Sequence, residues 1–259
     1  MNLANRAQTI DAHWIGLCRV GGIAALVAAI IFRRNLAAEY VLLRAMGMIT
    51  SGPIAPPTST LDWFTLLHDN RLVGLTLLNL FDMVNYALVG LILLGLYAAL
   101  KQTKMSSATL ALVIGIVGVA VYFACNQAFA VAALSDQYAA ATTDADRSMF
   151  LAAGHALLAV QSSGATYGNG FFISFFCVEV AGLIMAAIML RSNLFGRRTA
   201  YFGILANVLG LVYYVFQITV PALTAVSMSL SAVFLLIWYA LIGVRLLRLA
   251  SNGKIEMPT

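Results

Sequence analysis

The chain has 259 residues, of which 62% are hydrophobic and only 10% are charged, and its mean hydropathy is +0.92. A water-soluble domain carries about 25% charged residues, so this composition excludes a soluble protein with polar surface on all sides. The net charge of +5 does not indicate nucleic-acid binding, because most Lys and Arg residues lie at the ends of apolar runs, where they set membrane topology. We expect a polytopic membrane protein whose main partner is the lipid bilayer, with no nucleic-acid partner.

Six apolar stretches approach or exceed the length of about 20 residues that a transmembrane helix needs. In chain order, the predicted spans are about 14–32, 72–100, 108–134, 171–190, 199–219 and 225–244. No further domain is predicted outside these spans and their loops. The expected fold is therefore all-α, with residues 1–259 forming one six-helix transmembrane bundle.

Each of the two long loops contains a short predicted amphipathic helix that begins with a capping box. The sequence STLD starts a helix at about 59–69, and TDAD starts one at about 144–161. These helices carry His68 and His155, which we expect to lie above the bundle as a lid. Neither histidine has other ligands at a metal-binding spacing, so no metal site and no cofactor are predicted.

The second span carries a polar face in its first half. Asn79, Asp82 and Asn85 recur every third residue and share one side of a helix with Tyr86. A carboxyl group inside a spanning helix costs about 2.5–3.5 kcal/mol. This face is therefore expected to look into protein or a wet cavity and not into lipid.

Polar groups on the other spans fall at a similar depth, nearer the side of the two long loops. We predict that they line a ligand or ion pocket on the extracytoplasmic half of the bundle, formed by Asp82, Glu179, Asn79, Asn85, Asn126, Gln217 and Tyr86. The alternative for the two acids is a structural role as hydrogen-bonded buried carboxyls, and for each Asn or Gln it is helix–helix hydrogen bonding. Asn207 could line the pocket, but helix joining is favoured for it as for any single Asn, and Trp238 is interpreted as a packing residue or an interface anchor.

The distribution of basic residues predicts the orientation. Six spans place both termini on one side, and that side holds ten of the fifteen Lys and Arg residues. Arg33 and Arg34, at the outer end of the first span, are the main exception. The positive-inside rule then predicts an inner-membrane protein with both termini in the cytoplasm.

Three stretches from residue 149 onward carry a family resemblance: FLAAGHALL, MLRSNLFGRRTAYFGILANVLGL and IWYALIGVRLLRL. Together with the second span, they resemble a prokaryotic family of polytopic membrane proteins catalogued as domain of unknown function 4386. The likeness is strongest at 189–211. It implies a multi-helix inner-membrane protein of a bacterium or archaeon, and it implies no catalytic role for any residue.

Three classes of function fit these observations. The pocket could serve a small transporter, with Asp82 and Glu179 carrying protons, or it could belong to a membrane enzyme or sensor for a small molecule. In the third class, an accessory or structural subunit, the polar residues only join helices. A homo-oligomer is compatible with all three classes. The favoured interpretation is a loop-side pocket for a small molecule or ion, with proton-linked transport as its leading use.

Overall fold

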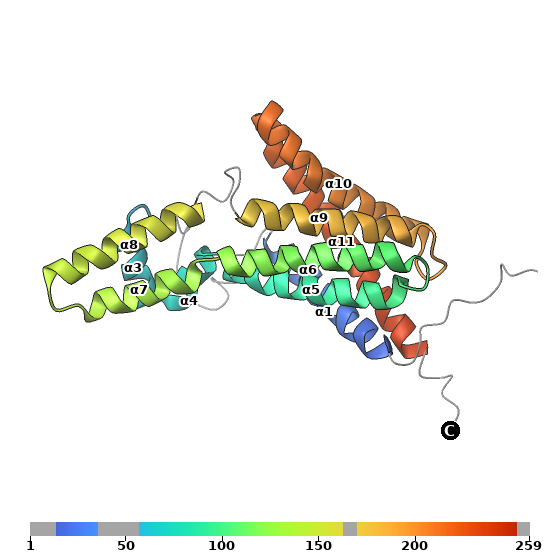
Figure 1. Cartoon of the computed structure of the whole chain (residues 1–259), viewed down its shortest axis with the longest axis horizontal. Helices are drawn as coiled ribbons and strands as arrows, with labels where there is room; N and C mark the ends of the chain where they lie inside the picture. The colour runs from blue at the N-terminus through green and yellow to red at the C-terminus, as the bar shows by residue number, and fades with distance from the viewer. Residues whose placement is uncertain (1–13, 36–56, 163–169, 253–259) are drawn as a thin grey trace, which may run out of the picture. The chain divides into compact units, whose positions relative to one another are not determined.

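The computed structural model describes residues 14–35, 57–162 and 170–252, and all regular structure within these ranges is helical (Figure 1). The prediction of an all-α fold is confirmed. The chain divides into two compact units, where the sequence led us to expect one bundle. Unit 1 comprises Met1–Phe32, Asn85–Ala120 and Ser174–Thr259, and unit 2 comprises Arg33–Val84 and Val121–Ile173.

Most of the long apolar helices belong to unit 1. They are α1 (Ile15–Asn35), α5 (Leu80–Leu100), α6 (Met105–Cys125), α9 (Gly170–Met189), α10 (Arg197–Thr219) and α11 (Thr224–Asn252), with the short 3₁₀ turn η3 (Pro221–Leu223) before α11. The first turns of α5 and α9 and the last turn of α6 belong to unit 2. Unit 2 also contains α3 (Thr60–Asp69), α4 (Arg71–Leu77), α7 (Ala128–Ala140) and α8 (Asp144–Ser162).

Five helical stretches in the described ranges are long and apolar enough to cross a membrane. They are Leu80–Leu100, Met105–Ala140, Gly170–Met189, Arg197–Thr219 and Pro221–Ser251. Large apolar side chains on them stay exposed, including Leu110 at 55%, Tyr201 at 55% and Ile218 at 68%. So much apolar surface suits contact with lipid and not with water. The first predicted span forms α1, whose apolar part, Ile15–Ile31, is shorter than these five.

Two of the predicted spans are interrupted. The stretch predicted at 72–100 breaks after α4, and Asn79 in the turn has a φ of 68°. The stretch predicted at 108–134 breaks between α6 and α7, where Asn126 Oδ1 accepts a hydrogen bond of 2.9 Å from the backbone N–H of Ala128. Asparagine tolerates the left-handed backbone, and its short side chain bonds to nearby N–H groups, so it can end a helix within an apolar run.

Helix α1 packs against two other helices of unit 1 through glycines. A Cβ on Gly21 would lie 2.7 Å from the Cα of Gly95 on α5, and a Cβ on Gly22 would lie 3.1 Å from the carbonyl oxygen of Gly243 on α11. Only glycine allows backbones to approach this closely, which is the usual way for apolar helices to gain contact in a bilayer.

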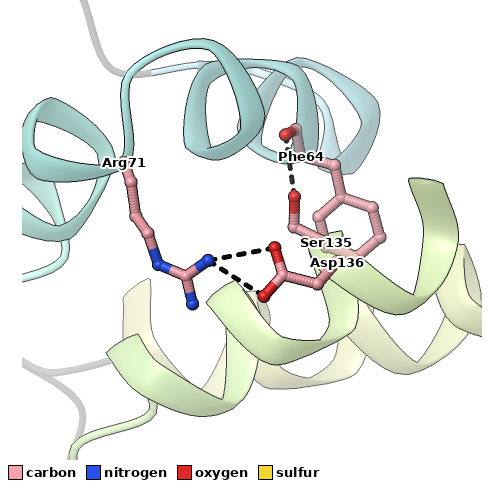
Figure 2. A network of polar contacts seen from close by, with 4 residues as sticks. All are labelled: Phe64, Arg71, Ser135 and Asp136. Carbon is pink, nitrogen blue, oxygen red and sulfur yellow. Dashed lines mark hydrogen bonds and ion pairs between the residues drawn. The ribbon is translucent and has the colours of Figure 1, made fainter. Parts of the chain in front are cut away.

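Unit 2 is held together by an apolar core and by polar contacts between α3, α4 and α7 (Figure 2). Ser135 Oγ on α7 donates a hydrogen bond of 2.9 Å to the carbonyl oxygen of Phe64 on α3. Arg71 Nη1, at the start of α4, contacts both carboxylate oxygens of Asp136 at 3.0 and 2.9 Å. Helices α7 and α8 run side by side in Figure 1 and share this core.

Both predicted capping boxes are confirmed. Ser59 Oγ accepts a hydrogen bond from the backbone N–H of Asp62 at 3.1 Å and donates one to its carboxylate at 2.7 Å. Thr143 makes the same pair of bonds with Asp146, at 3.1 and 2.6 Å. The hydroxyls of Ser59 and Thr143 therefore cap the starts of α3 and α8, and the carboxylates of Asp62 and Asp146 accept hydrogen bonds from these hydroxyls.

The glycine contact between α1 and α5 predicts a matched pair of substitutions. Gly21→Ala should lower the thermal midpoint of the full chain in detergent, because the added methyl group meets the backbone of Gly95. Gly16→Ala, on the same helix, has nothing within 4 Å of the added Cβ and should be neutral or stabilising by up to about 1 kcal/mol. Equal midpoints for the two variants would contradict this packing.

The contacts of α7 with α3 and α4 predict unequal effects from two neighbouring residues. Ser135→Ala removes a buried hydrogen bond and should cost about 1 kcal/mol of local stability. Asp136→Asn alters an ion pair whose side chains are 52% and 53% exposed, and it should cost less. Hydrogen exchange measured by mass spectrometry at α3 tests this, and a larger effect from Asp136→Asn would refute the assignment.

Candidate functional site

The structure distributes the predicted site residues over both units. Unit 1 holds Asn85, Tyr86, Glu179 and Gln217, whereas unit 2 holds Asn79, Asp82, Asn126, His68 and His155. We therefore describe two candidate sites, one inside each unit.

The site in unit 1 is centred on Glu179 of α9, which is 2% exposed. Its carboxyl group lies against Gly210 of α10, where a Cβ would collide with it. Asn207, one turn earlier on α10, lies in the same way against Gly182 of α9. The glycines thus make room for polar side chains that would otherwise keep α9 and α10 apart.

Trp238 of α11 completes this arrangement. Its indole ring lies against Gly203 of α10, where a Cβ would be 2.5 Å from Nε1. Asn207 Nδ2 donates a hydrogen bond of 2.6 Å to the carbonyl oxygen of the same Gly203. Serines of α11 fix the two helices further, since Ser231 Oγ donates to the carbonyl oxygen of Ala206 at 2.9 Å.

A small cavity of about 20 Å³ lies between these side chains. Its wall contains Glu179, Asn207, Trp238 and Tyr239, and apolar residues of α5, α9 and α11 close the rest. Tyr86, also predicted for the site, lies on α5 in the same unit but is not among the residues that line this cavity. The structure thus places Glu179 at this cavity together with Asn207 and Trp238, which the sequence analysis had assigned to helix contacts.

The remaining predicted residues of unit 1 do not line this cavity. Asn85 is buried on α5 at 7% exposure, and Gln217 is half-buried near the end of α10. For Asn207 a sequence signal was present, since it shares one helix face with Gly210. For Trp238 no sequence signal was present, because its partner glycine is on another helix.

Asp82 has a different position from the one that the sequence suggested. The break at Asn79 places it in the first turn of α5, half-buried, and not in the middle of a continuous span. The positive end of the helix dipole stabilises an acid in the first turn. The position of Asp82 at the start of α5 can therefore be explained by stabilisation of the helix, without a ligand.

The site in unit 2 is a larger pocket of about 440 Å³. It lies between the start of α3, the second half of α8 and the turn that follows α4; the lining residues are Pro57, Thr58, Ser59, Thr60, Trp63, Leu77, Leu78, Asn79, His155, Leu158 and Ala159. Gly154 lets α8 approach α3, because a Cβ there would meet the ring of Phe64 and the methyl group of Thr60. This contact places the next residue, His155, at the pocket.

Two predicted residues meet in this pocket, and others stay apart from it. Asn79 and His155 both line it, whereas His68, in the last turn of α3, is exposed and is not among the lining residues. Asn126 lies just before α7 and accepts a hydrogen bond from the backbone N–H of Ala128, as described above. Across the described ranges, no group of three His, Cys, Asp or Glu side chains is arranged to hold a metal ion.

Comparison with models of protein families, with curated proteins and with solved structures gives no match. The resemblance to the family catalogued as domain of unknown function 4386 therefore stays a prediction. What each site can do is inferred from its own geometry.

The backbone of Asn79 predicts how substitutions there behave. Asn79→Gly should preserve the thermal midpoint, because glycine adopts a φ of 68° without strain. Asn79→Val should lower the midpoint, because a β-branched residue at this φ costs at least about 1 kcal/mol of unfolding free energy. Thermal unfolding of the purified variants tests this. If Asn79→Gly destabilises the chain as much as Asn79→Val, the side chain and not the backbone is what the turn needs.

Proposed function

We propose that the protein is a multi-pass protein of the inner (plasma) membrane that binds a small amphipathic molecule in the pocket of unit 2. The pocket itself carries this proposal, since its volume of about 440 Å³ lies within the usual range for small-molecule sites. It combines apolar walls with a few polar side chains, as such sites commonly do.

The lining residues support an amphipathic ligand. Trp63, Leu77, Leu78 and Leu158 offer apolar contact, and Asn79 and His155 offer hydrogen bonds. Ser59 is already engaged with Asp62, so its hydroxyl contributes less to binding. A ligand with an apolar body and one polar head satisfies both kinds of wall.

Binding is better supported than transport. A transporter needs a path for its substrate along the bundle, whereas the cavity beside Glu179 has a volume of only about 20 Å³ and is lined mainly by apolar side chains. A membrane sensor or enzyme fits the pocket equally well, and His155 is the residue that would serve acid–base chemistry there.

The proposed topology has six spans, α1, α5, α6, α9, α10 and α11, and both termini in the cytoplasm. Helices α5 and α6 have 21 residues each, so each can cross the bilayer without its neighbour α4 or α7. The segments of unit 2 then belong to the loops between α1 and α5 and between α6 and α9, which lie on the extracytoplasmic side. The ligand would enter the pocket from that side.

Filling the pocket tests the proposed function. Ala159→Trp places an indole among the lining residues, whereas Ala153→Trp adds the same group at an exposed position of α8 that does not line the pocket. We expect native mass spectrometry of the full chain to find a co-purifying small molecule on the parent and on Ala153→Trp, and to find it lost from Ala159→Trp.

His155→Phe should retain the fold, because the side chain is exposed, and should weaken retention of that molecule about two- to tenfold through the lost hydrogen bond. A parent that carries no small molecule, or equal retention by all variants, would count against the pocket.

A further inference from the structure

One end of unit 1 carries many positive charges and no exposed acid among the described residues. The only described acid of unit 1 is Glu179, which is 2% exposed. The basic residues all lie within about two turns of a helix end; they are Arg19, Lys101, Lys104, Arg191, Arg197, Arg198, Arg245 and Arg248. In the described part of unit 1, no exposed carboxylate therefore offsets this charge.

Contacts between helices place these residues at the same end of unit 1. Lys101 Nζ, just after α5, lies 3.5 Å from the centroid of the Trp14 ring, just before α1. Arg245 Nε on α11 donates a hydrogen bond to the carbonyl oxygen of Leu194, in the connector between α9 and α10. Helix α1 runs antiparallel to α5 and α11 through the glycine contacts described above. The starts of α1 and α10 and the ends of α5, α9 and α11 therefore lie together.

The connector between α9 and α10 is fixed to unit 1 by buried residues. Leu194 and Phe195 are 7% and 5% exposed, and Ser192 Oγ accepts a hydrogen bond of 3.1 Å from the backbone N–H of Leu194. Arg197 and Arg198, which follow in the first turn of α10, are exposed. A ligand bound by these two side chains therefore does not have to order the backbone, which lowers the entropic cost of binding.

An apolar stripe continues from these two arginines along the exposed side of α10. Tyr201, Leu205 and Val208 follow Arg197 by four, eight and eleven residues, and they are 55%, 47% and 38% exposed. At about 100° per residue, these positions share one side of the helix. From Arg197 to Val208 the rise is about 16 Å, close to the roughly 15 Å of hydrocarbon in one leaflet of a bilayer.

The order of charge and apolar surface matches the chemistry of a phospholipid. Guanidinium groups bind phosphate through paired N–H donors, and an acyl chain suits the exposed apolar side chains below them. Free phosphate would leave the apolar stripe without a ligand contact. The other basic residues at this end favour a lipid with net negative charge over one that also carries an ammonium group.

We propose that the exposed side of α10 binds one anionic phospholipid. Arg197 and Arg198 hold its phosphate, and an acyl chain lies along Tyr201, Leu205 and Val208. This site belongs to unit 1 and is independent of the pocket proposed for unit 2. The lipid acts as a specific ligand of the helix, beyond the general effect of basic residues on membrane orientation.

Native mass spectrometry of the full chain in detergent, with defined lipids added, tests the proposal. We expect the parent to bind phosphatidylglycerol more tightly than phosphatidylcholine. Arg197→Gln combined with Arg198→Gln should weaken phosphatidylglycerol binding roughly 20-fold, the size expected when two Arg residues near an anionic headgroup are lost. Arg197→Lys combined with Arg198→Lys keeps both charges and should lose much less.

A second double variant with the same change of charge is the control. Arg19→Gln combined with Lys104→Gln removes two exposed cations from the same end of unit 1 but outside α10, and it should bind phosphatidylglycerol nearly as tightly as the parent. Leu205→Ala should weaken binding more than Leu110→Ala, which shortens an exposed side chain of α6. Equal losses in the two Gln double variants, equal binding of both lipids by the parent, or displacement of the lipid by an equal concentration of inorganic phosphate would overturn the proposal.

Discussion

Close approach between helices at glycine is the constraint on which unit 1 depends. In a bilayer, lipid tails are as apolar as leucine side chains, so helices associate through van der Waals contact and interhelical hydrogen bonds. Gly21 and Gly95 bring α1 onto α5, and Gly22 and Gly243 bring it onto α11. The glycines of α9 and α10 use the same closeness differently, since each accepts a polar side chain from its neighbour. On α9 and α10, the glycines therefore allow close helix packing and also make room for buried polar side chains.

The sequence predicts the helices well where the signal is local. Apolar runs predict the helical fold, and two four-residue capping boxes predict the starts of α3 and α8, which the hydrogen bonds of Ser59 and Thr143 confirm. The interruptions at Asn79 and Asn126 were not predicted. Both residues stand in apolar runs with helical periodicity, and that pattern does not distinguish an asparagine that faces a cavity from one that ends the helix. The backbone angle and the capping bond make that distinction.

The candidate site in unit 1 was predicted only in part, for a geometric reason. Glu179 is recognisable because a carboxyl group in an apolar helix is costly, and Gly182 beside it indicated that another helix comes close. Which side chain fills that space depends on how α9, α10 and α11 are rotated about their axes. These rotations cannot be predicted from the residues near each position in the sequence, because they depend on contacts between helices. The roles of Asn207 and Trp238 therefore become clear only from their contacts with glycines on other helices.

The two acids that first suggested proton transfer have different surroundings, and this difference supports the proposal that the ligand binds in unit 2. Asp82 lies in the first turn of α5, where the helix dipole offsets its charge, and Glu179 is enclosed by α9, α10 and α11. The cavity that Glu179 lines has a volume of only about 20 Å³, which is too small for most substrates. In unit 2, by contrast, the exposed His155 and the half-buried Asn79 line a pocket about twenty times larger, of about 440 Å³. These volumes support the proposal that a ligand binds in unit 2 and favour a structural role for the polar residues beside Glu179.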